Sequence, residues 1–130
     1  MVSESKKITT HNFELEVHED GYYLIRIFGD DEFTVDDLKI LVKGQKELGA
    51  KLIPSLVLCA EQASTNIDLL NTLAKKAFNP YSVADAFVLS SMSQRILANF
   101  YIKINKPERP TRFFNEPETA LIWLKDYLAS

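Results

Sequence analysis

The stretch that decides the fold runs from Asp85 to Leu128. It reads DAFVLS at residues 85–90, SMSQRILANFYIKINKPERP at 91–110 and TRFFNEPETALIWLKDYL at 111–128. Two short apolar runs, bounded by Ser, Asn and Pro, alternate with two segments whose apolar residues recur at helical spacing. Parallel strands linked by a helix over one sheet face have this pattern. The stretch therefore predicts strand, helix, connector, strand and closing helix.

The N-terminal part predicts an antiparallel strand pair. Apolar and polar residues alternate from Phe13 to Val17, which is typical of a half-buried strand. The turn HEDG follows at residues 18–21, and residues 22–28 are apolar except Arg26, so we expect a second strand inside the sheet. Residues 1–12 are polar, and we expect a flexible lead-in that becomes ordered only near Phe13. Residues 13–130 are expected to form a single domain.

The middle of the chain predicts two helices around a strand. Thr34 precedes two aspartates and is expected to cap a helix that Gly49 ends in a left-handed conformation. A strand follows at residues 52–59, with its hydrogen-bonded part after Pro54, because proline lacks the backbone N–H. The next helix spans about residues 66–78. Its expected inward residues are Ile67, Leu70, Leu73, Ala74 and Ala77.

Two further helix starts lie in the C-terminal stretch. Ser90 or Ser91 is expected to cap the long helix, and Ser91 and Gln94 have capping-box spacing. Residues 115–118 predict a second capping box, with Pro117 in the first turn of the closing helix. The expected apolar side of the long helix comprises Ile96, Leu97, Phe100, Tyr101 and Ile104.

The resulting order, β-β-α-β-α-β-α-β-α, predicts an α/β domain with a mixed, mostly parallel sheet of about five strands and four helices. From about Phe13 to Leu128 the chain resembles the STAS-like, or SpoIIAA-like, domains. The most specific part is the tail TRFFNEPETALIWL at residues 111–124, which resembles the closing strand and helix of that family. The resemblance implies a non-enzymatic regulatory or protein-interaction domain. Relatives by fold include anti-sigma-factor antagonists, transporter-associated STAS domains and the lipid-binding CRAL-TRIO domains, so the fold alone settles no function.

Composition excludes several classes of function. The chain has 46% hydrophobic and 25% charged residues, a net charge of -3 and a pI near 5.4, which are ordinary for a globular domain. No basic stripe suggests nucleic-acid binding. No apolar run approaches the ~20 residues of a membrane span, and the N-terminus lacks a signal-peptide core, so we expect a cytoplasmic protein.

The sequence shows no catalytic or metal-binding constellation. Cys59 ends an apolar run, which predicts a buried, inert thiol. His11 and His18 have no Ser, Cys or second His at a catalytic spacing, and Asp30 to Glu32 lack the spacing of a calcium loop. We therefore expect no enzyme, no cofactor and no metal site.

One family feature can be traced onto this chain. The resemblance implies a phosphorylated Ser, between Asp and Ser-Gly, at a helix start after the middle strand; the matching place is Ala63 to Asn66, which lacks both the Asp and the Gly. We interpret Ser64 or Thr65 as a helix cap. Backbone N–H groups at these helix entries nevertheless define a candidate switch or binding rim. It comprises Ser64, Thr65, Asn66, Ser90, Ser91, Asp30 and Asp31.

A small-molecule or lipid-binding module is the alternative to an interaction domain. The residues that motivate it are the aromatic side chains Phe28, Phe33, Phe78, Phe100, Tyr101 and Trp123. A closed pocket lined by such residues favours this alternative, whereas a flat, filled surface favours an interaction domain.

Two surface features are also predicted. Sequential right-handed β-α units place helices on one sheet face, so the other face is expected to expose an apolar patch that a homodimer or another partner covers. The patch consists of Leu24, Phe28, Leu56 and Leu58 or, on the other side, Ile25, Ile27, Val57 and Phe114. A solvated basic region around the connector comprises Lys103, Lys106, Arg109 and Arg112.

Overall fold

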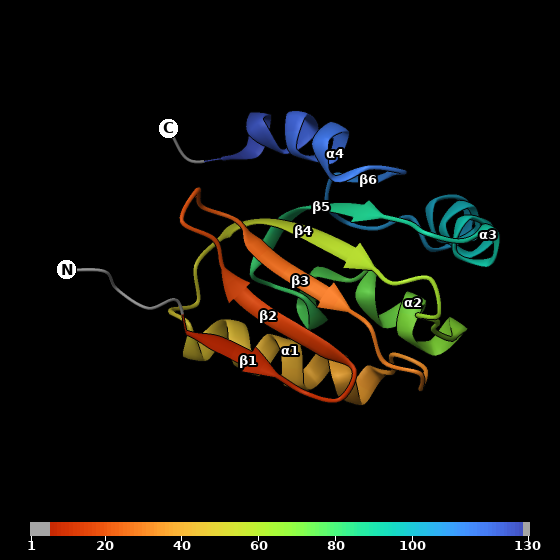
Figure 1. Ribbon diagram of the computed structural model, residues 1–130, viewed down its shortest axis with the longest axis horizontal. Helices are drawn as coiled ribbons and strands as arrows, with labels where there is room; N and C mark the ends of the chain where they lie inside the picture. Colours follow the sequence, from red (N-terminus) through yellow and green to blue (C-terminus); the bar gives the residue numbers. More distant parts are fainter. Residues whose placement is uncertain (1–5, 129–130) are drawn as a thin grey trace.

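The fold is organised by a six-stranded sheet whose strands are neighbours in chain order (Figure 1). The computed structural model describes residues 6–128. The strands are β1 (Lys7–Thr9), β2 (Phe13–Val17), β3 (Tyr23–Ile27), β4 (Ile53–Cys59), β5 (Ser82–Val88) and β6 (Thr111–Phe114). β1, β2 and β3 pair antiparallel, and β3 to β6 pair parallel. The predicted α/β class with a mixed, mostly parallel sheet is confirmed.

The sixth strand, β1, was not predicted. Lys7, Ile8 and Thr9 pair with residues 14–16 of β2, within the segment that we expected to be a loose lead-in. Ile8 packs against the core beside Gly44, where an added Cβ would lie 2.8 Å from the Ile8 side chain. A three-residue strand with one apolar side chain shows no periodicity in the sequence. Residues 1–5 of the lead-in lie outside the described part of the chain.

Three helices lie on one face of the sheet, here called the α1–α3 face. They are α1 (Val35–Glu47), α2 (Ile67–Leu73) and α3 (Met92–Phe100), which continues into a π-helical turn, η2 (Tyr101–Asn105). Each connects parallel strands that are neighbours in the sheet, and right-handed crossovers in one direction place all three helices on the same side. Their core includes Phe13, Leu15, Tyr23, Ile25, Leu38 and Tyr101.

The closing helix α4 (Pro117–Leu124) packs on the opposite face, the α4 face. In Figure 1, α4 lies above β4 and β5, whereas α1 and α2 lie below them. Its cluster contains Tyr22, Leu24, Leu56, Ala86, Val88, Ala120 and Leu124. The prediction that one face lacks a helix was wrong, because α4 follows the last strand. It connects no two strands, so crossover handedness does not constrain it.

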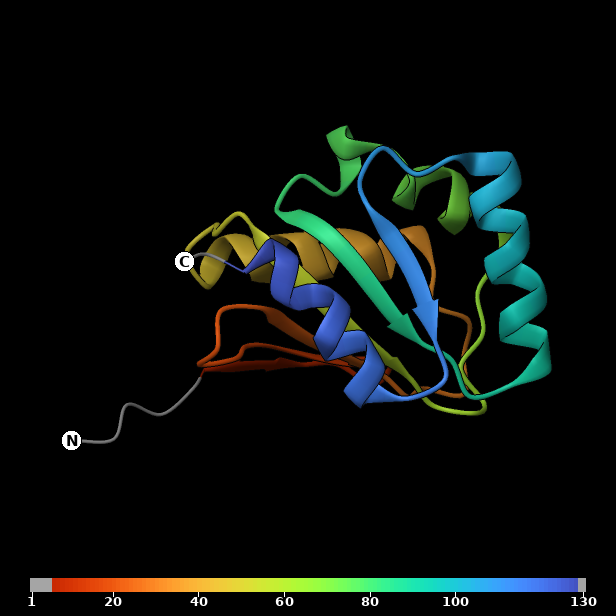
Figure 2. The same ribbon diagram turned by 90° about the horizontal axis from the view of Figure 1, so that it is seen from above.

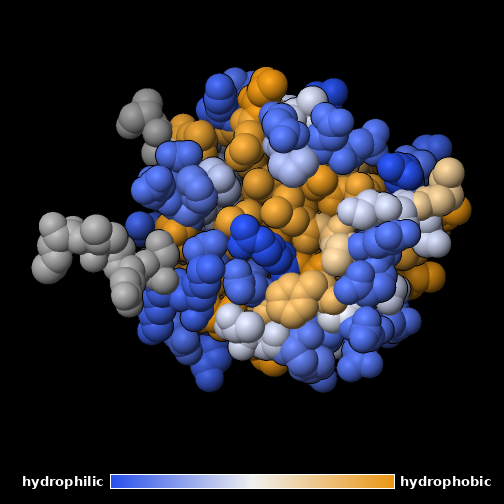
Figure 3. Space-filling view, viewed as in Figure 1, coloured by the Kyte–Doolittle hydropathy of each residue, from blue (hydrophilic) through white to orange (hydrophobic). Residues whose placement is uncertain are grey.

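The expected apolar patch is therefore largely covered. Leu24 and Leu56 are buried under α4, Ile25 and Val57 are buried on the α1–α3 face, and Phe114 packs on Trp123 of α4. The part of the α4 face over β2 and β3 carries charges instead: Arg26 pairs with Glu14 at 3.2 Å and Glu16 at 3.5 Å. Partly exposed apolar side chains remain between these regions. Figure 3 shows them in the hollow next to α4.

Several helix ends form as predicted. Thr34 accepts a hydrogen bond from Asp37 N while the Asp37 carboxylate accepts one from Thr34 N, a complete capping box. Gly49, with φ of +114°, ends α1 in the left-handed region. Ser91 caps α3 and accepts a hydrogen bond from Gln94 N at 3.2 Å.

Other helix features differ from the prediction. α2 is capped by Asn66, not by Ser64 or Thr65. It ends at Leu73, before a 3-10 turn at Lys76–Phe78. Ile67 and Ala77, which were expected to face inward, are exposed. α4 begins after Glu116 without a side-chain cap. The oxygen of Asn115, the expected cap, instead accepts hydrogen bonds from Arg95 at 3.1 and 3.2 Å.

α3 is rotated relative to the prediction. Leu97 and Tyr101 face inward as expected, but Ile96, Phe100 and Ile104 are exposed, and Gln94 and Ala98 are buried in their place. The amide of Gln94 donates to the carbonyl oxygens of Ala60 (2.7 Å) and Ala63 (3.0 Å). These bonds hold a polar side of the helix against the 60–63 loop, because buried carbonyls need donors.

Candidate functional site

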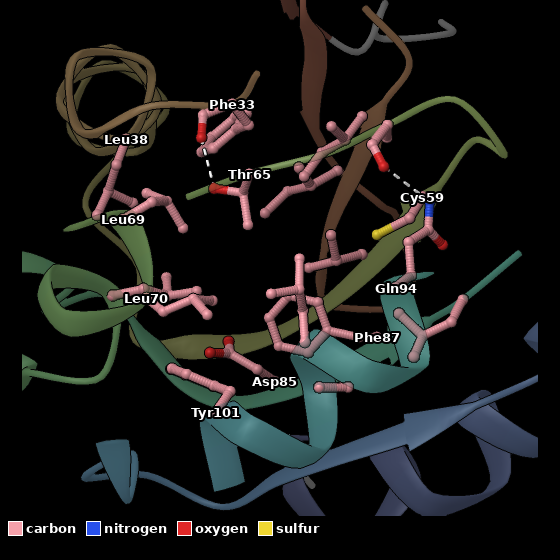
Figure 4. Close-up of a pocket in the computed structure, with 18 of the residues that line it drawn as sticks. Phe33, Leu38, Cys59, Thr65, Leu69, Leu70, Asp85, Phe87, Gln94 and Tyr101 are labelled. Atoms are coloured by element: carbon pink, nitrogen blue, oxygen red, sulfur yellow. Dashed lines mark hydrogen bonds between the residues drawn. The ribbon is translucent and has the colours of Figure 1, made fainter. Parts of the chain in front are cut away.

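A cavity of about 130 Å³ lies between the sheet and helices α1, α2 and α3 (Figure 4). Side chains from the four parallel strands β3 to β6 form its floor, and leucines from α1, α2 and α3 form much of its walls. The apolar lining includes Ile25, Val57, Phe87, Phe113, Phe33, Leu38, Leu41, Leu69, Leu70, Leu73, Leu97 and Ala98. Every lining residue belongs to the α1–α3 face or its loops, and none belongs to the α4 cluster.

One end of the cavity contains a buried ion pair. Arg109 Nη1 donates to Asp85 Oδ2 at 3.1 Å and to the carbonyl oxygen of Leu73 at 3.0 Å. The Ser82 hydroxyl donates to the other Asp85 oxygen and lies 2.7 Å from the Ser55 hydroxyl. Both charged side chains are almost fully buried, at 5% and 3% exposed. Asp85 reaches the cavity from β5, whereas Arg109 holds it from the connector before β6.

Burial affects the acidity of this group. Desolvation raises the pKa of Asp85 above its ordinary value, and the Arg109 guanidinium and the Ser82 hydroxyl act in the opposite direction. Burial also raises the pKa of the neighbouring Tyr101, so its phenol stays protonated across the physiological range. Asp85 and Arg109 thus form an ion pair whose charges cancel, next to the uncharged hydroxyl of Tyr101.

Two polar atoms on cavity-lining residues have no hydrogen-bond partner within residues 6–128. They are the Tyr101 hydroxyl and Gln45 Oε1, both shielded from solvent. The Tyr101 hydroxyl makes no hydrogen bond of ordinary geometry, although the nearby Arg109 side chain acts on it and opposes the rise of its pKa. An unsatisfied buried polar atom costs about 1–3 kcal/mol. A molecule inside the cavity that offers one donor and one acceptor would recover that free energy, so these atoms are candidate binding groups in a mostly apolar space.

The predicted rim lies at another border of the same cavity. Ser64 and Thr65 are lining residues, and the Thr65 hydroxyl donates to the Phe33 carbonyl at 2.6 Å. Asn66 caps α2 and its amide donates to Glu32 Oε2 at 3.1 Å. The loop that begins at Gly29 is thus tied to residues 64–66 by side-chain bonds and by the backbone bridge between Phe33 and Thr65.

The other rim residues stand further from the cavity lining. Ser90 donates to the Cys59 carbonyl at 2.7 Å, and Ser91 caps α3. Asp30 and Asp31 are exposed, and Asp31 Oδ2 lies 3.7 Å from His11 Nε2. The structure therefore brings Ser64, Thr65, Asn66, Ser90 and Ser91 onto the loops that join β4 and β5 to their helices. Asp30 and Asp31 flank them in the loop before α1.

Comparison with known proteins places the chain in a family. Residues 17–128 match the model of a domain of unknown function, DUF7793. The chain belongs to the DUF7793 family. No match was found among curated proteins.

A solved structure is similar to this DUF7793 domain over nearly its whole length. It is the crystal structure of an uncharacterized protein of the DUF3478 family with a SpoIIAA-like fold, from Shewanella loihica PV-4. The TM-score is 0.55 and the sequence identity 14%, over 95% of this chain and 98% of the other. At this identity the likeness concerns the fold alone, and it confirms the predicted STAS-like, SpoIIAA-like domain.

Cys59 lines the cavity of the DUF7793 domain and directs its sulfur into it (Figure 4). Burial raises the pKa of the thiol to about 12, although the residue as a whole is only half-buried. The histidines lie elsewhere: His18 accepts a hydrogen bond from Asp20 N in the hairpin turn and stacks on Tyr22. Among residues 6–128 no three His, Cys, Asp or Glu side chains gather as a metal site, and no helix is long and apolar enough to cross a bilayer.

Sequence reasoning missed the ion pair. Arg109 was placed in a solvated basic region, but it is buried and paired with Asp85. The signal was available: Asp85 is the single charged residue in the apolar strand SVADAFV, and a charge there requires a partner. Of the six aromatic residues proposed to line a pocket, only Phe33 and Tyr101 do so. The aliphatic side chains of α1, α2 and α3 contribute more lining residues than the aromatic side chains do.

Proposed function

We propose that this DUF7793 domain is a non-enzymatic binding domain of the STAS-like type, whose cavity takes up a small, mostly apolar, uncharged molecule. The observation that carries the proposal is the coexistence of the apolar cavity with the unpartnered Tyr101 hydroxyl and Gln45 Oε1 on its lining residues. A packing defect would be expected to leave only apolar surface, whereas a ligand site combines apolar walls with a few placed polar groups.

The size of the cavity limits the ligand. Apolar cavities of about 150 Å³ bind benzene or xenon, and the cavity here measures about 130 Å³. A single aromatic ring or a short branched chain fits this volume without rearrangement of the helices. A full-length fatty acyl chain requires more space than the described cavity offers.

The polar end limits the charge of the ligand. An anionic ligand would approach the Asp85 carboxylate, and a cationic ligand would compete with Arg109, which already pairs with Asp85 at 3.1 Å. Both alternatives would leave a buried charge without compensation, which is strongly unfavourable. A neutral molecule with one hydroxyl group avoids this penalty, since it can donate to Gln45 Oε1 or accept from Tyr101.

We place the entrance at the rim formed by Ser64, Thr65 and the loop before α1. Ser64 is exposed and yet lines the cavity, so this is a point where the lining meets the surface. The acidic residues Asp30, Asp31 and Glu32 beside it are exposed. They favour the approach of neutral or cationic molecules over anions, in agreement with the uncharged ligand.

Benzene and phenol are suitable probes, and solution NMR of methyl groups is the readout. Both should shift the methyl resonances of Leu41, Leu69 and Leu70, and phenol should bind more tightly because its hydroxyl finds the free polar atoms. The filling variant Ala98→Leu should abolish the shifts, because Ala98 lines the cavity. The matched control Ala120→Leu places the same group on the α4 face and should leave binding intact if the variant folds.

Absence of methyl shifts in the wild-type protein at saturating probe concentration would refute the proposal. So would equal shifts in wild type and in Ala98→Leu, because the probe would then be bound elsewhere. Tighter binding of benzene than phenol would remove the assigned role of Tyr101 and Gln45.

A regulatory protein-interaction role, which the STAS resemblance implies, is the second candidate. The observation in its favour is that Ser64 is exposed on the loop that precedes α2, at the position that resembles the phosphorylated Ser of that family. Mass spectrometry of the protein isolated from its native cells tests it. Phosphate on Ser64 supports a phosphorylation switch at this residue, and complete absence of phosphate from Ser64 under all growth conditions contradicts it.

A further inference from the structure

The outer side of α3 and η2 carries a stripe of exposed apolar side chains. Met92, Ile96, Phe100 and Ile104 follow one another at intervals of four residues, so they lie on one side of the helix. Met92, Ile96 and Ile104 are 68%, 63% and 64% exposed. Hydrophobic atoms are visible at the right-hand edge of Figure 3, where α3 lies.

The charged side chains of the segment that carries this stripe, residues 92–107, are all basic. Arg95, Lys103 and Lys106 are exposed, and the sequence contains no acidic residue between Asp85 and Glu108. This segment contrasts with the whole chain, whose net charge is -3. A helix with an exposed apolar stripe and basic neighbours is the pattern of an amphipathic helix that lies in the plane of a membrane interface.

A polar hollow continues the stripe beyond Ile104. Lys75, Asn71 and Lys106 line this hollow of about 430 Å³ together with Ala74, Ile104, Asn105 and Glu108. Glu108 is its single acidic side chain, and one of its oxygens already accepts a hydrogen bond from Lys76 N at 3.0 Å. Two lysines at the end of an apolar stripe match the chemistry of an anionic headgroup beside an acyl surface.

We propose that α3 and η2 dock this protein on an anionic lipid membrane surface. Met92, Ile96, Phe100 and Ile104 enter the interface between headgroups and acyl chains, while Arg95, Lys103, Lys106 and Lys75 contact headgroup phosphates. Figure 2 shows α3 along an outer edge of the molecule, away from β1–β3. Because the stripe residues are exposed on this outer helix, a flat membrane surface suits them better than a narrow protein groove. This inference is independent of the proposed ligand of the cavity.

Co-sedimentation with vesicles tests the proposal. The wild-type protein should bind vesicles of phosphatidylglycerol and phosphatidylcholine, and bind weakly to vesicles of phosphatidylcholine alone. Ile96→Glu and Met92→Glu should each reduce binding at least tenfold, since each buries a charge at the interface. Lys103→Glu should reduce it about fivefold or more, and added salt should weaken wild-type binding.

Matched controls separate the stripe from general surface effects. Ile122→Glu changes an equally exposed isoleucine on α4, and Lys43→Glu changes an exposed lysine on α1, so both should bind vesicles as the wild type does. Circular dichroism should show the same thermal transition for all variants, because the changed side chains are exposed. Absence of wild-type binding to anionic vesicles, or equal loss in Ile96→Glu and Ile122→Glu, would overturn the proposal. Capture of a protein partner through the stripe without vesicle binding would also overturn it.

Discussion

The two faces of the sheet are covered by helices in different ways. Three crossover helices cover the α1–α3 face, where Gln45, Ser55, Asp85 and Arg109 are buried around a cavity. A single terminal helix covers the α4 face, where the cluster is apolar apart from the Tyr22 hydroxyl and includes two alanines, Ala86 and Ala120, at 0% exposure. Small side chains let α4 approach the sheet closely. The three helices whose positions are fixed by strand connections enclose a cavity and buried polar groups, whereas the terminal helix, which no such connection constrains, packs tightly on the sheet.

The largest expected difference between the faces concerns their ion pairs. Arg109→Met should destabilise the protein by about 3–5 kcal/mol, because it leaves the Asp85 carboxylate buried without its partner. The corresponding change on the α4 face, Arg26→Met, should cost at most about 1 kcal/mol, since Arg26 and Glu14 are partly exposed. Urea unfolding measures both values. The double variant Asp85→Leu/Arg109→Met should be more stable than either single variant. If its loss in free energy of unfolding equalled the sum of the two single losses, the pairing would be contradicted.

Substitutions that enlarge a buried side chain should change the free energy of unfolding differently on the two faces. Ala120→Leu overpacks the α4 cluster and should cost about 1–3 kcal/mol. Ala98→Leu adds the same atoms toward the cavity and should leave the free energy of unfolding unchanged or raise it, because the side chain fills existing space. Thermal unfolding of both variants is the measurement. Equal destabilisation by the two substitutions would indicate that the α1–α3 face is as filled as the α4 face.

The pH dependence of the free energy of unfolding should show the contribution of Asp85. Because its folded pKa is raised, the folded state holds its proton more tightly than the unfolded state. This contribution is fully present below the unfolded pKa and is lost as the pH rises through the folded pKa. Arg109→Met removes one influence that lowers the pKa, so its destabilisation relative to wild type should grow with pH by up to about 1.4 kcal/mol per unit. Urea titrations between about pH 4 and pH 8 test this; Asp85→Leu/Arg109→Met should lose the added slope.

The thiol of Cys59 reports on the α1–α3 face without altering stability. With its pKa raised to about 12, few molecules carry a thiolate at neutral pH. Iodoacetamide should therefore label native Cys59 about a thousandfold more slowly than the unfolded chain. Benzene in the cavity should slow labelling further, because the sulfur points into that space. Labelling at the rate of a free thiol would show that the cavity opens readily to solvent.

Local signals made much of the fold predictable. Alternation at Phe13–Val17, the cap at Thr34, the left-handed end at Gly49 and the Ser91 to Gln94 spacing all depend on neighbouring residues, and all are found in the structure. The rotation of α3 was not predictable from its own apolar residues. It depends on carbonyl groups of the 60–63 loop, more than thirty residues away, that accept from Gln94.

The candidate site was predictable only in part. Ser64 and Thr65 were identified from their place after the middle strand, which parallel topology brings to the cavity rim. The Asp85–Arg109 pair joins residues separated by twenty-four positions and depends on how the connector folds back, with Asp85 N donating to Pro110 O and Glu108 N to Ala74 O. Periodicity carries no information on such long-range pairing.

The strand order gives the chain a direction for folding during synthesis. Each strand pairs with the one made just before it, so the sheet can grow from β1 to β6 as the polypeptide leaves the ribosome, without waiting for a distant strand to insert. The helix α4 breaks this sequence of events. Leu24 and Leu56 emerge long before residues 117–124 exist to cover them, so a nascent chain stalled before α4 presents an apolar sheet face. This interval is when a chaperone would be most needed.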